Sequence, residues 1–347
     1  MIVLLSLVSE LCSIFIDPNA QYDLDQTPGI HQLSHNGTHL VSKPRPDIDG
    51  YFRRIYYQSR NGDNPLNLPV NYTVLQDYPY STAMNAVRDQ QQCGGCWAFA
   101  VTDVAASYSY IRSHNKKDNP IRDYEGSAQY QINCDHQCAP KPSTNCNRGC
   151  SGGMIFYAAY WTSQNGYHEP SCVAYKNGDR TCIHACDDGR ILSRHALDTE
   201  ETIAFYFAHD PNEIDLSNYI RKQLIFSFGP AAIQYTVYDD FQSVLNKQEI
   251  YKKSPYANEV EGHAVTCYGW GISAGGTSYW LAKNSWGEGW NDGGYFKIHR
   301  GDNTCGVESL TVFYAPATWD EKIYRGGASR ISAPILALGL LLSFILM

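Results

Sequence analysis

One cysteine stands where its sulfur could act as a nucleophile. Cys96 follows two glycines and opens the run CWAFAVTDVAASYSYIR over 96–112, whose apolar and small residues recur at the helical period. A thiolate is the reactive form of cysteine, and the positive end of a helix dipole lowers a thiol pKa. The glycines let a second backbone approach closely. We therefore predict a reactive thiol at the start of a helix, which needs a base and an oxyanion donor nearby.

The same segment has other interpretations. Cys93 and Cys96 form C-x-x-C, which occurs in redox pairs and in half of a zinc site. In redox motifs the aromatic residue usually precedes the first cysteine, whereas Trp97 follows the second one here. No second C-x-x-C or H-x-x-x-H follows downstream. The sequence therefore favours a nucleophile at Cys96 over a redox or zinc role or a buried structural thiol.

A base and its partner occur far downstream. His263 is one of eleven histidines and lies in a Gly262–Gly271 run that is typical of a strand. Asn284 follows in the segment NSWG. An imidazole at His263 can take the thiol proton and return it to a leaving amine. An amide oxygen at Asn284 can hold that ring in the productive tautomer, while Trp286 can cover the bond and exclude water.

These three segments resemble the papain family of cysteine proteases, which includes the cathepsins. The family pattern Q-x-x-C-x-x-C-W-A-F is met from Gln90 to Phe99, GHAV and YGWG match the histidine strand, and NSWG with GGYF matches the asparagine segment. The resemblance covers residues 68–316 in the family's order. It implies that Cys96 attacks, His263 is its base, Asn284 orients the base, and Gln90 with the Cys96 backbone N–H forms the oxyanion hole.

The resemblance also implies a substrate cleft and disulfides. Cys150-Ser151-Gly152-Gly153 matches the family segment C-x-G-G, in which the glycine backbone pairs with an extended substrate; the simpler interpretation is a tight turn. Cys93 is expected to pair with Cys150, which leaves the Cys96 thiol available for chemistry. Cys134 is expected to pair with Cys172. Proximity suggests Cys138–Cys146 and Cys182–Cys186, with Cys267 and Cys305 as buried thiols, although connectivity does not follow from one sequence.

The C-terminal motifs resemble cathepsin B most closely. The segment from Cys305 to Leu310, CGVESL, matches that branch, where the residue at Leu310 lies at the base of the pocket for P2, the second residue before the scissile bond. An apolar Leu310 predicts an apolar P2 residue. Cathepsin B also carries a loop with paired histidines that closes part of the cleft and gives removal of dipeptides from C-termini. The segment 172–182 has no such histidine pair, which favours an endopeptidase over a cathepsin B- or X-like exopeptidase.

The remaining segments indicate the organisation of the chain. Residues 1–17 are apolar and predict a signal peptide, and 18–66 are polar and predict a propeptide. A peptidase domain is expected over 67–318, helical in its first half and rich in strands from Phe226 onward. Residues 319–347 form a linker and an apolar tail, interpreted as a GPI signal or a short membrane anchor.

Composition narrows the class of protein. The chain has 347 residues, a formal charge of −8 and no basic stripe, which argues against a nucleic-acid partner. Its twelve cysteines favour the oxidising secretory pathway. Two glycosylation sequons, at Asn36 and Asn71, agree with that route. We expect a lysosome-like or vacuole-like compartment, or the extracellular space or cell surface.

The sequence predicts an α+β, papain-like fold with a helical lobe, a β-barrel-like lobe and the active-site cleft between them. The predicted activity is peptide-bond hydrolysis through a Cys96 acyl-enzyme by a monomer that is made as a zymogen and uses no cofactor or metal. Protein or peptide substrates are the expected partners. The alternatives are an exopeptidase and, in another class, a catalytically inactive relative that binds proteins; the competent residues at all four working positions disfavour the latter.

Overall fold

The computed structural model describes residues 30–33, 38–41, 56–57, 68–116, 122–138, 146–192, 194–195, 197, 202–208, 214–245 and 249–316. The predicted signal peptide, the sequon at Asn36 and the predicted C-terminal tail lie outside these residues. Within the described residues, no helix has the length and apolarity that crossing a bilayer requires.

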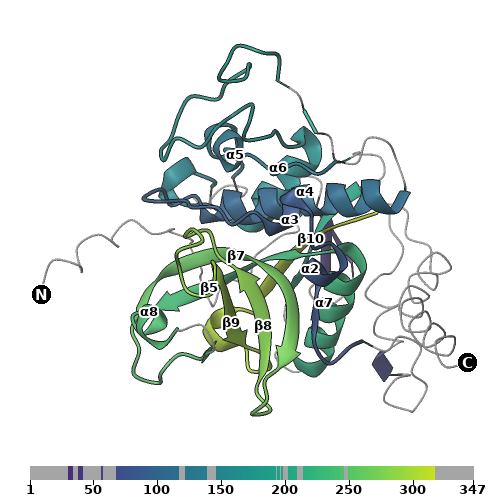
Figure 1. Ribbon diagram of the computed structural model, residues 1–347, viewed down its shortest axis with the longest axis vertical. Helices are drawn as coiled ribbons and strands as arrows, with labels where there is room; N and C mark the ends of the chain where they lie inside the picture. The colour runs from purple at the N-terminus through teal and green to yellow at the C-terminus, as the bar shows by residue number, and fades with distance from the viewer. Residues whose placement is uncertain are drawn as a thin grey trace, which may run out of the picture.

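The helices of two turns or more gather in the first half of the described chain, as predicted, with one exception (Figure 1). The exception is α7, which includes Phe226, where the sequence analysis expected strands to begin. The helices are α2 (Val74–Asp77), α3 (Thr82–Asn85), α4 (Cys96–Lys116), α5 (Ala128–Cys134), α6 (Ile155–Asn165), α7 (Ile214–Phe228) and α8 (Phe241–Val244), with 3₁₀ turns η2 (Gly149–Ser151) and η3 (Thr304–Gly306).

The strands form one sheet in the order β1-β2-β4-β10-β5-β7-β8-β9-β6, and β3 pairs with β7. Their bounds are β1 (Ile30–Leu33), β2 (Thr38–Val41), β3 (Tyr72–Thr73), β4 (Thr202–Ala208), β5 (Ala231–Tyr238), β6 (Ile250–Tyr251), β7 (Glu259–Ile272), β8 (Ser278–Lys283), β9 (Tyr295–His299) and β10 (Leu310–Pro316). Strands β1 and β2 lie inside the predicted propeptide and form a hairpin that extends the sheet through β4. Two segments within 18–66 therefore pair with the sheet of the peptidase domain.

The two halves of the chain meet along α4. This helix is almost entirely buried, because small residues such as Ala105 and Ala106 let the sheet and neighbouring helices pack closely. Helices α5 and α6 pack on α4 on one side, and strands β5, β7 and β10 pack on the other (Figure 1), while α3 also contacts α4. The fold is the predicted α+β arrangement of a helical lobe and a curled sheet, with α4 at their boundary.

Candidate active site

Cys96 is the first residue of α4, where the sequence placed it. Ala98 N and Phe99 N donate to Gly95 O at 2.9 and 3.2 Å, so the first helical hydrogen bonds are formed by the glycine before it. A Cβ on Gly95 would lie 2.6 Å from Cδ1 of Ile132, so a larger residue there would have to displace that side chain. The sulfur accepts a hydrogen bond from Ala264 N at 3.3 Å, across the boundary between the lobes.

Cys96 departs from one expectation. The sequence analysis expected an available thiol there, but in the structure Cys96 is disulfide-bonded. Its partner is not one of the described cysteines, which form the four pairs given below or are buried thiols. A disulfide sulfur carries no proton for a base to remove, and thiolate chemistry at Cys96 requires that this bond be absent.

The predicted base and its partner lie together. His263 Nε2 and Asn284 Oδ1 are 2.8 Å apart, and Ser285 N donates to the same oxygen at 2.8 Å. Because a backbone N–H must face an acceptor, the Ser285 bond fixes this atom as the amide oxygen. Nε2 of His263 must then be the protonated nitrogen, and a neutral ring has its lone pair on Nδ1. No described residue forms a hydrogen bond with Nδ1.

Burial controls the imidazole. His263 has no exposed surface, and desolvation lowers its pKa to about 4, although the bond with Asn284 acts in the opposite direction. Trp286 stacks on the ring with centroids 4.8 Å apart and an interplanar angle of 30°. The indole therefore covers the imidazole, as the sequence predicted. The arrangement holds a neutral ring beside Cys96 with its basic nitrogen unoccupied.

Gln90 is tied to the same group. Its Oε1 accepts from Ser285 Oγ at 2.6 Å, its backbone N donates to Ser285 O at 2.8 Å, and its Nε2 donates to Cys93 O at 3.0 Å. These bonds orient the amide with one N–H of Nε2 in the Cys93 bond. Ser285 was not predicted, yet it fixes both Gln90 and Asn284. The only sequence signal for it was its position next to Asn284.

A second set of contacts holds the loop before Cys96. Tyr175 Oη donates to Gln90 O at 2.5 Å, and Gln92 N donates to Asn177 Oδ1 at 3.1 Å. Asp179 Oδ1 accepts from Cys150 N at 2.6 Å. The segment 175–179 therefore braces this loop and the adjacent disulfide. Sequence reasoning missed these residues, because contacts 85 residues apart leave no local pattern.

The predicted substrate-binding residues are in two places. Gly152 has φ +103°, and a Cβ on Gly153 would lie 2.7 Å from the Trp97 ring, so each position requires glycine for a different reason. Trp97 is the residue after Cys96, which places these glycines next to the start of α4. Leu310 is the first residue of β10 and is buried.

The disulfides correct part of the predicted pairing. Cys93 pairs with Cys150 and Cys138 with Cys146, but Cys134 pairs with Cys182, and Cys172 with Cys186. The predicted Cys134–Cys172 and Cys182–Cys186 bonds are therefore wrong.

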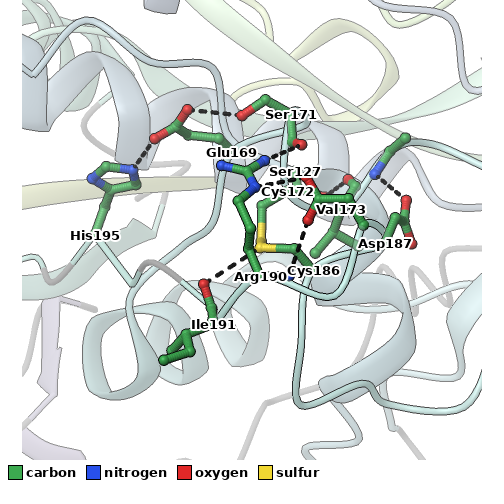
Figure 2. The surroundings of a disulfide bond; sticks show 12 residues. Ser127, Glu169, Ser171, Cys172, Val173, Cys186, Asp187, Arg190, Ile191 and His195 are labelled. Atoms are coloured by element: carbon green, nitrogen blue, oxygen red, sulfur yellow. Dashed lines mark hydrogen bonds and ion pairs between the residues drawn. A yellow bond between two sulfur atoms is a disulfide. The ribbon is translucent and has the colours of Figure 1, made fainter.

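Local hydrogen bonds give the reason for the pairing. Asp187 N donates to Cys172 O at 2.8 Å, which brings residues 172 and 186 together (Figure 2). Arg180 N donates to Asn133 Oδ1 at 3.1 Å, which brings Cys182 to the end of α5.

A buried ion pair lies beneath the site. Lys283 Nζ donates to Asp103 Oδ1 at 3.1 Å and to the carbonyl oxygens of Met84 and Ala86 at 2.7 and 2.8 Å. Burial lowers the pKa of Lys283. Lys283 precedes Asn284, and Asp103 lies on α4 two turns after Cys96. These side chains line a small cavity between the lobes together with Arg88 and Ala264.

The structure thus brings Cys96, His263, Asn284, Gln90 and Trp286 to one place. Among the described residues, no group of three or more His, Cys, Asp or Glu side chains is arranged to hold a metal ion.

Comparison with known proteins agrees with this geometry. The model of the papain family of cysteine proteases matches residues 75–315. A gut-specific cysteine proteinase of Caenorhabditis elegans is 28% identical, with 71% of this chain and 73% of that protein covered. A cathepsin B-like cysteine proteinase of the same organism is 26% identical, with 80% and 82% covered.

Solved structures give the same result for the fold. A procathepsin B from Trypanosoma congolense superposes with a TM-score of 0.63 at 20% identity, covering 90% of this chain and 88% of that chain. Bromelain from Ananas comosus, in complex with the E64 inhibitor, superposes with a TM-score of 0.52 at 25% identity, covering 73% of this chain and all of that one.

Proposed function

Since this chain belongs to the papain family of cysteine proteases, we propose that Cys96, His263, Asn284 and Gln90 carry out its peptide-bond hydrolysis. One observation supports this assignment above the others. The sulfur at the start of α4 lies 3.3 Å from the N–H of the residue after His263, and that histidine is hydrogen-bonded to Asn284 at 2.8 Å. Three segments distant in sequence thereby provide a nucleophile, a base and an orienting group at one point.

In the acylation step, Nδ1 of His263 takes the proton of Cys96, and the resulting thiolate attacks the scissile carbonyl carbon. The carbonyl oxygen becomes an oxyanion, stabilised by the Cys96 backbone N–H and the second N–H of Gln90 Nε2. The tetrahedral intermediate collapses as its C–N bond breaks. The imidazolium gives its proton to the departing amine, and a thioester remains on Cys96.

In the deacylation step, His263 removes a proton from water and the hydroxide oxygen attacks the thioester carbon. The C–S bond breaks, the acid product leaves, and the sulfur regains the proton. Asn284 keeps Nε2 protonated throughout, so Nδ1 is always the nitrogen that faces the reaction. The disulfide at Cys96 must be absent from the active enzyme, because only a thiol can enter this cycle.

We assign internal cleavage rather than C-terminal trimming. The segment 172–186 is closed by a disulfide at Cys172 and tied down at Tyr175 and Asn177 against the loop before Cys96. It has no histidine pair at 172–182 to hold a substrate carboxylate. Without that histidine pair, the segment favours substrates that continue past it. End-product analysis of a long peptide would show internal fragments, and release of dipeptides alone would contradict this assignment.

The P2 pocket is the next part of the proposal. Leu310 is buried at the start of β10 and gives the P2 pocket an apolar wall, so Leu, Val, Phe and Tyr should be preferred there to Arg.

Biosynthesis is the last part of the proposal. Residues 18–66 would act as a propeptide, and the secretory pathway would deliver the enzyme to a lysosome-like compartment or outside the cell. These assignments rest on the sequence patterns described above.

The test of the nucleophile is covalent labelling of the mature protein. An epoxysuccinyl inhibitor should add one mass equivalent to the wild type, at Cys96, and abolish peptide hydrolysis. Cys96→Ala should take up no label and have no activity. Cys267→Ser is the matched control, because Cys267 is a buried thiol on β7 beside the site; it should label like the wild type. Labelling at Cys96 without hydrolysis of any peptide would instead indicate an inactive binding protein.

A further inference from the structure

A buried glutamine lies beside the reacting groups without its full set of hydrogen bonds. Gln234 is on β5 with only 3% of its surface exposed, and no described residue donates to its Oε1. Leaving a buried amide oxygen unsatisfied is costly, and native proteins rarely keep such atoms without a purpose. The position of Gln234 in the sheet indicates what it could bind.

Strand register places Gln234 between two other residues of the site. Gln234 is the register partner of Ala264 on β7, and Ala264 N is the group that contacts the Cys96 sulfur. On the other side, Ile233 pairs with Thr311, so the next step of the antiparallel register sets Gln234 opposite Leu310. Directly paired residues project from the same face of a sheet. Leu310, Gln234 and Ala264 therefore form a row of side chains across three strands.

This row faces the helical lobe. Tyr314, four residues after Leu310 on β10, packs on Tyr108 of α4 with ring centroids 6.0 Å apart, and its hydroxyl donates to Ala159 O of α6. Side chains alternate along a strand, so Leu310 lies on the same face as Tyr314. His263 and Tyr235 pack against each other on the opposite face. The Ala264 end of the row lies next to Cys96, because Ala264 N contacts the Cys96 sulfur at 3.3 Å.

We propose that Gln234 determines specificity at P2 by accepting a hydrogen bond from the hydroxyl of a substrate tyrosine. This inference rests on the proposed function and refines its P2 pocket. A tyrosine suits the row because its ring can pack on Leu310 while its polar tip reaches the amide oxygen. Serine and threonine are too short to do both. Lysine and arginine would bring a charge to a row that has no carboxylate, and burying an unpaired charge is unfavourable.

The size of the preference follows from the nature of the bond. A neutral hydrogen bond corresponds to a change of about 2- to 10-fold in kcat/KM. Phenylalanine fills the same space but leaves Oε1 unsatisfied. O-methyltyrosine keeps the ether oxygen, cannot donate, and brings a methyl group towards the amide. The expected order at P2 is therefore tyrosine, then phenylalanine, then O-methyltyrosine.

The test uses fluorogenic peptides that differ only at P2, cleaved by the mature enzyme. The wild type should cleave the tyrosine peptide about 2- to 10-fold better than the phenylalanine peptide. In Gln234→Leu the tyrosine-to-phenylalanine ratio should fall to about one or below, while the kcat/KM for phenylalanine is kept or improved. Thr236→Val is the matched control, because Thr236 lies two residues along β5 on the same face and should leave the ratio unchanged.

The outcomes separate the two levels of the proposal. A wild-type ratio of one or less, or an unchanged ratio in Gln234→Leu, would overturn the role of Gln234 while leaving the peptidase assignment intact. The wild-type peptide series decides the matter even if the leucine variant does not fold. If no peptide is cleaved and Cys96 is not labelled by an epoxysuccinyl inhibitor, the proposed function fails, and the inference fails with it.

Discussion

Removing the Asn284 side chain is the sharpest test of how the imidazole is held. His263 has no exposed surface, so in Asn284→Ala the proton on Nε2 would face no acceptor and little water. An unsatisfied buried donor costs about 1–3 kcal/mol. The ring can relieve this only by moving its proton to Nδ1, which removes the base from the nitrogen that Cys96 needs. Either way, kcat/KM should fall about 5- to 150-fold, since each 1.36 kcal/mol is a factor of ten.

The pH profile gives an independent readout. Activity requires the imidazolium of the thiolate–imidazolium pair, so it is lost on the alkaline side as that proton dissociates. The bond to Asn284 raises the pKa of His263, and losing it should move the alkaline limb of kcat/KM to lower pH. Asn284→Asp keeps an acceptor and adds a negative charge, which stabilises the imidazolium and should move the limb to higher pH.

Two comparisons make this prediction refutable. Asn165→Ala also removes an asparagine hydrogen bond, from Nδ2 to Trp161 O at 2.9 Å, but at the end of α6 away from the site; it should leave the pH profile unchanged. The reasoning is refuted if Asn284→Ala keeps kcat/KM within twofold of the wild type, or if the alanine and aspartate variants shift the limb in the same direction. Thermal unfolding of each variant separates misfolding from loss of catalysis.

Two further predictions concern burial. Trp286→Ala should admit water to His263 and weaken the desolvation that lowers the pKa of the imidazole, so that pKa should rise. The alkaline limb of a pH profile of inhibitor labelling should then move to higher pH. An unchanged profile would mean that the indole does not control the ring. Asp135 is buried and its pKa is raised to about 7, so the folded state holds its proton more tightly than the unfolded state and stability should fall as pH rises from about 4 to 7. In Asp135→Asn the unfolding free energy should depend less on pH across that window, by a few kcal/mol at most, as measured by denaturant titration. A pH dependence equal to that of the wild type would contradict the raised pKa of Asp135.

The sequence predicted the site better than it predicted the structure that supports it. Cys96 could be placed at a helix N-terminus because a glycine pair and a helical period are local signals, and α4 begins there. His263 and Asn284 could be paired because the family resemblance implies that the two residues lie together, which no local pattern indicates. The part played by Ser285 depends on two long-range contacts with Gln90, and nothing in its neighbourhood indicates them.

The disulfides show where one-dimensional reasoning fails. Pairing depends on which Cα atoms the fold brings within about 4.4–6.8 Å, and sequence spacing does not determine that. Cys134 has two candidate partners downstream, at Cys172 and Cys182. The choice is made by the turn at Asp187 and by the contact between Arg180 and Asn133. Neither contact could be anticipated before α5 and the following loops were placed.

Strand content was also underestimated, for a physical reason. Strands β1 and β2 lie in a polar stretch with weak alternation, so their hydrophobic pattern carries little signal. Strand β2 pairs with β4, an edge supplied by a distant segment, and β1 pairs with β2. The composition of this stretch did not indicate strands, because β-propensity is a weak guide where pairing with a distant strand decides the conformation.

The buried charges beneath the site connect its two halves. Cys96 is on α4 and Asn284 follows β8, so the catalytic geometry depends on how the helix and the sheet are aligned. Asp103, on α4, receives a hydrogen bond from Lys283, the residue before Asn284, at 3.1 Å, and one from Tyr268 of β7 at 3.0 Å. A buried ion pair adds little net stability, but removing Asp103 is strongly unfavourable because the buried Lys283 loses the carboxylate that it is bonded to. The pair therefore penalises displacement of the helix relative to the strands, which would pull Lys283 away from Asp103.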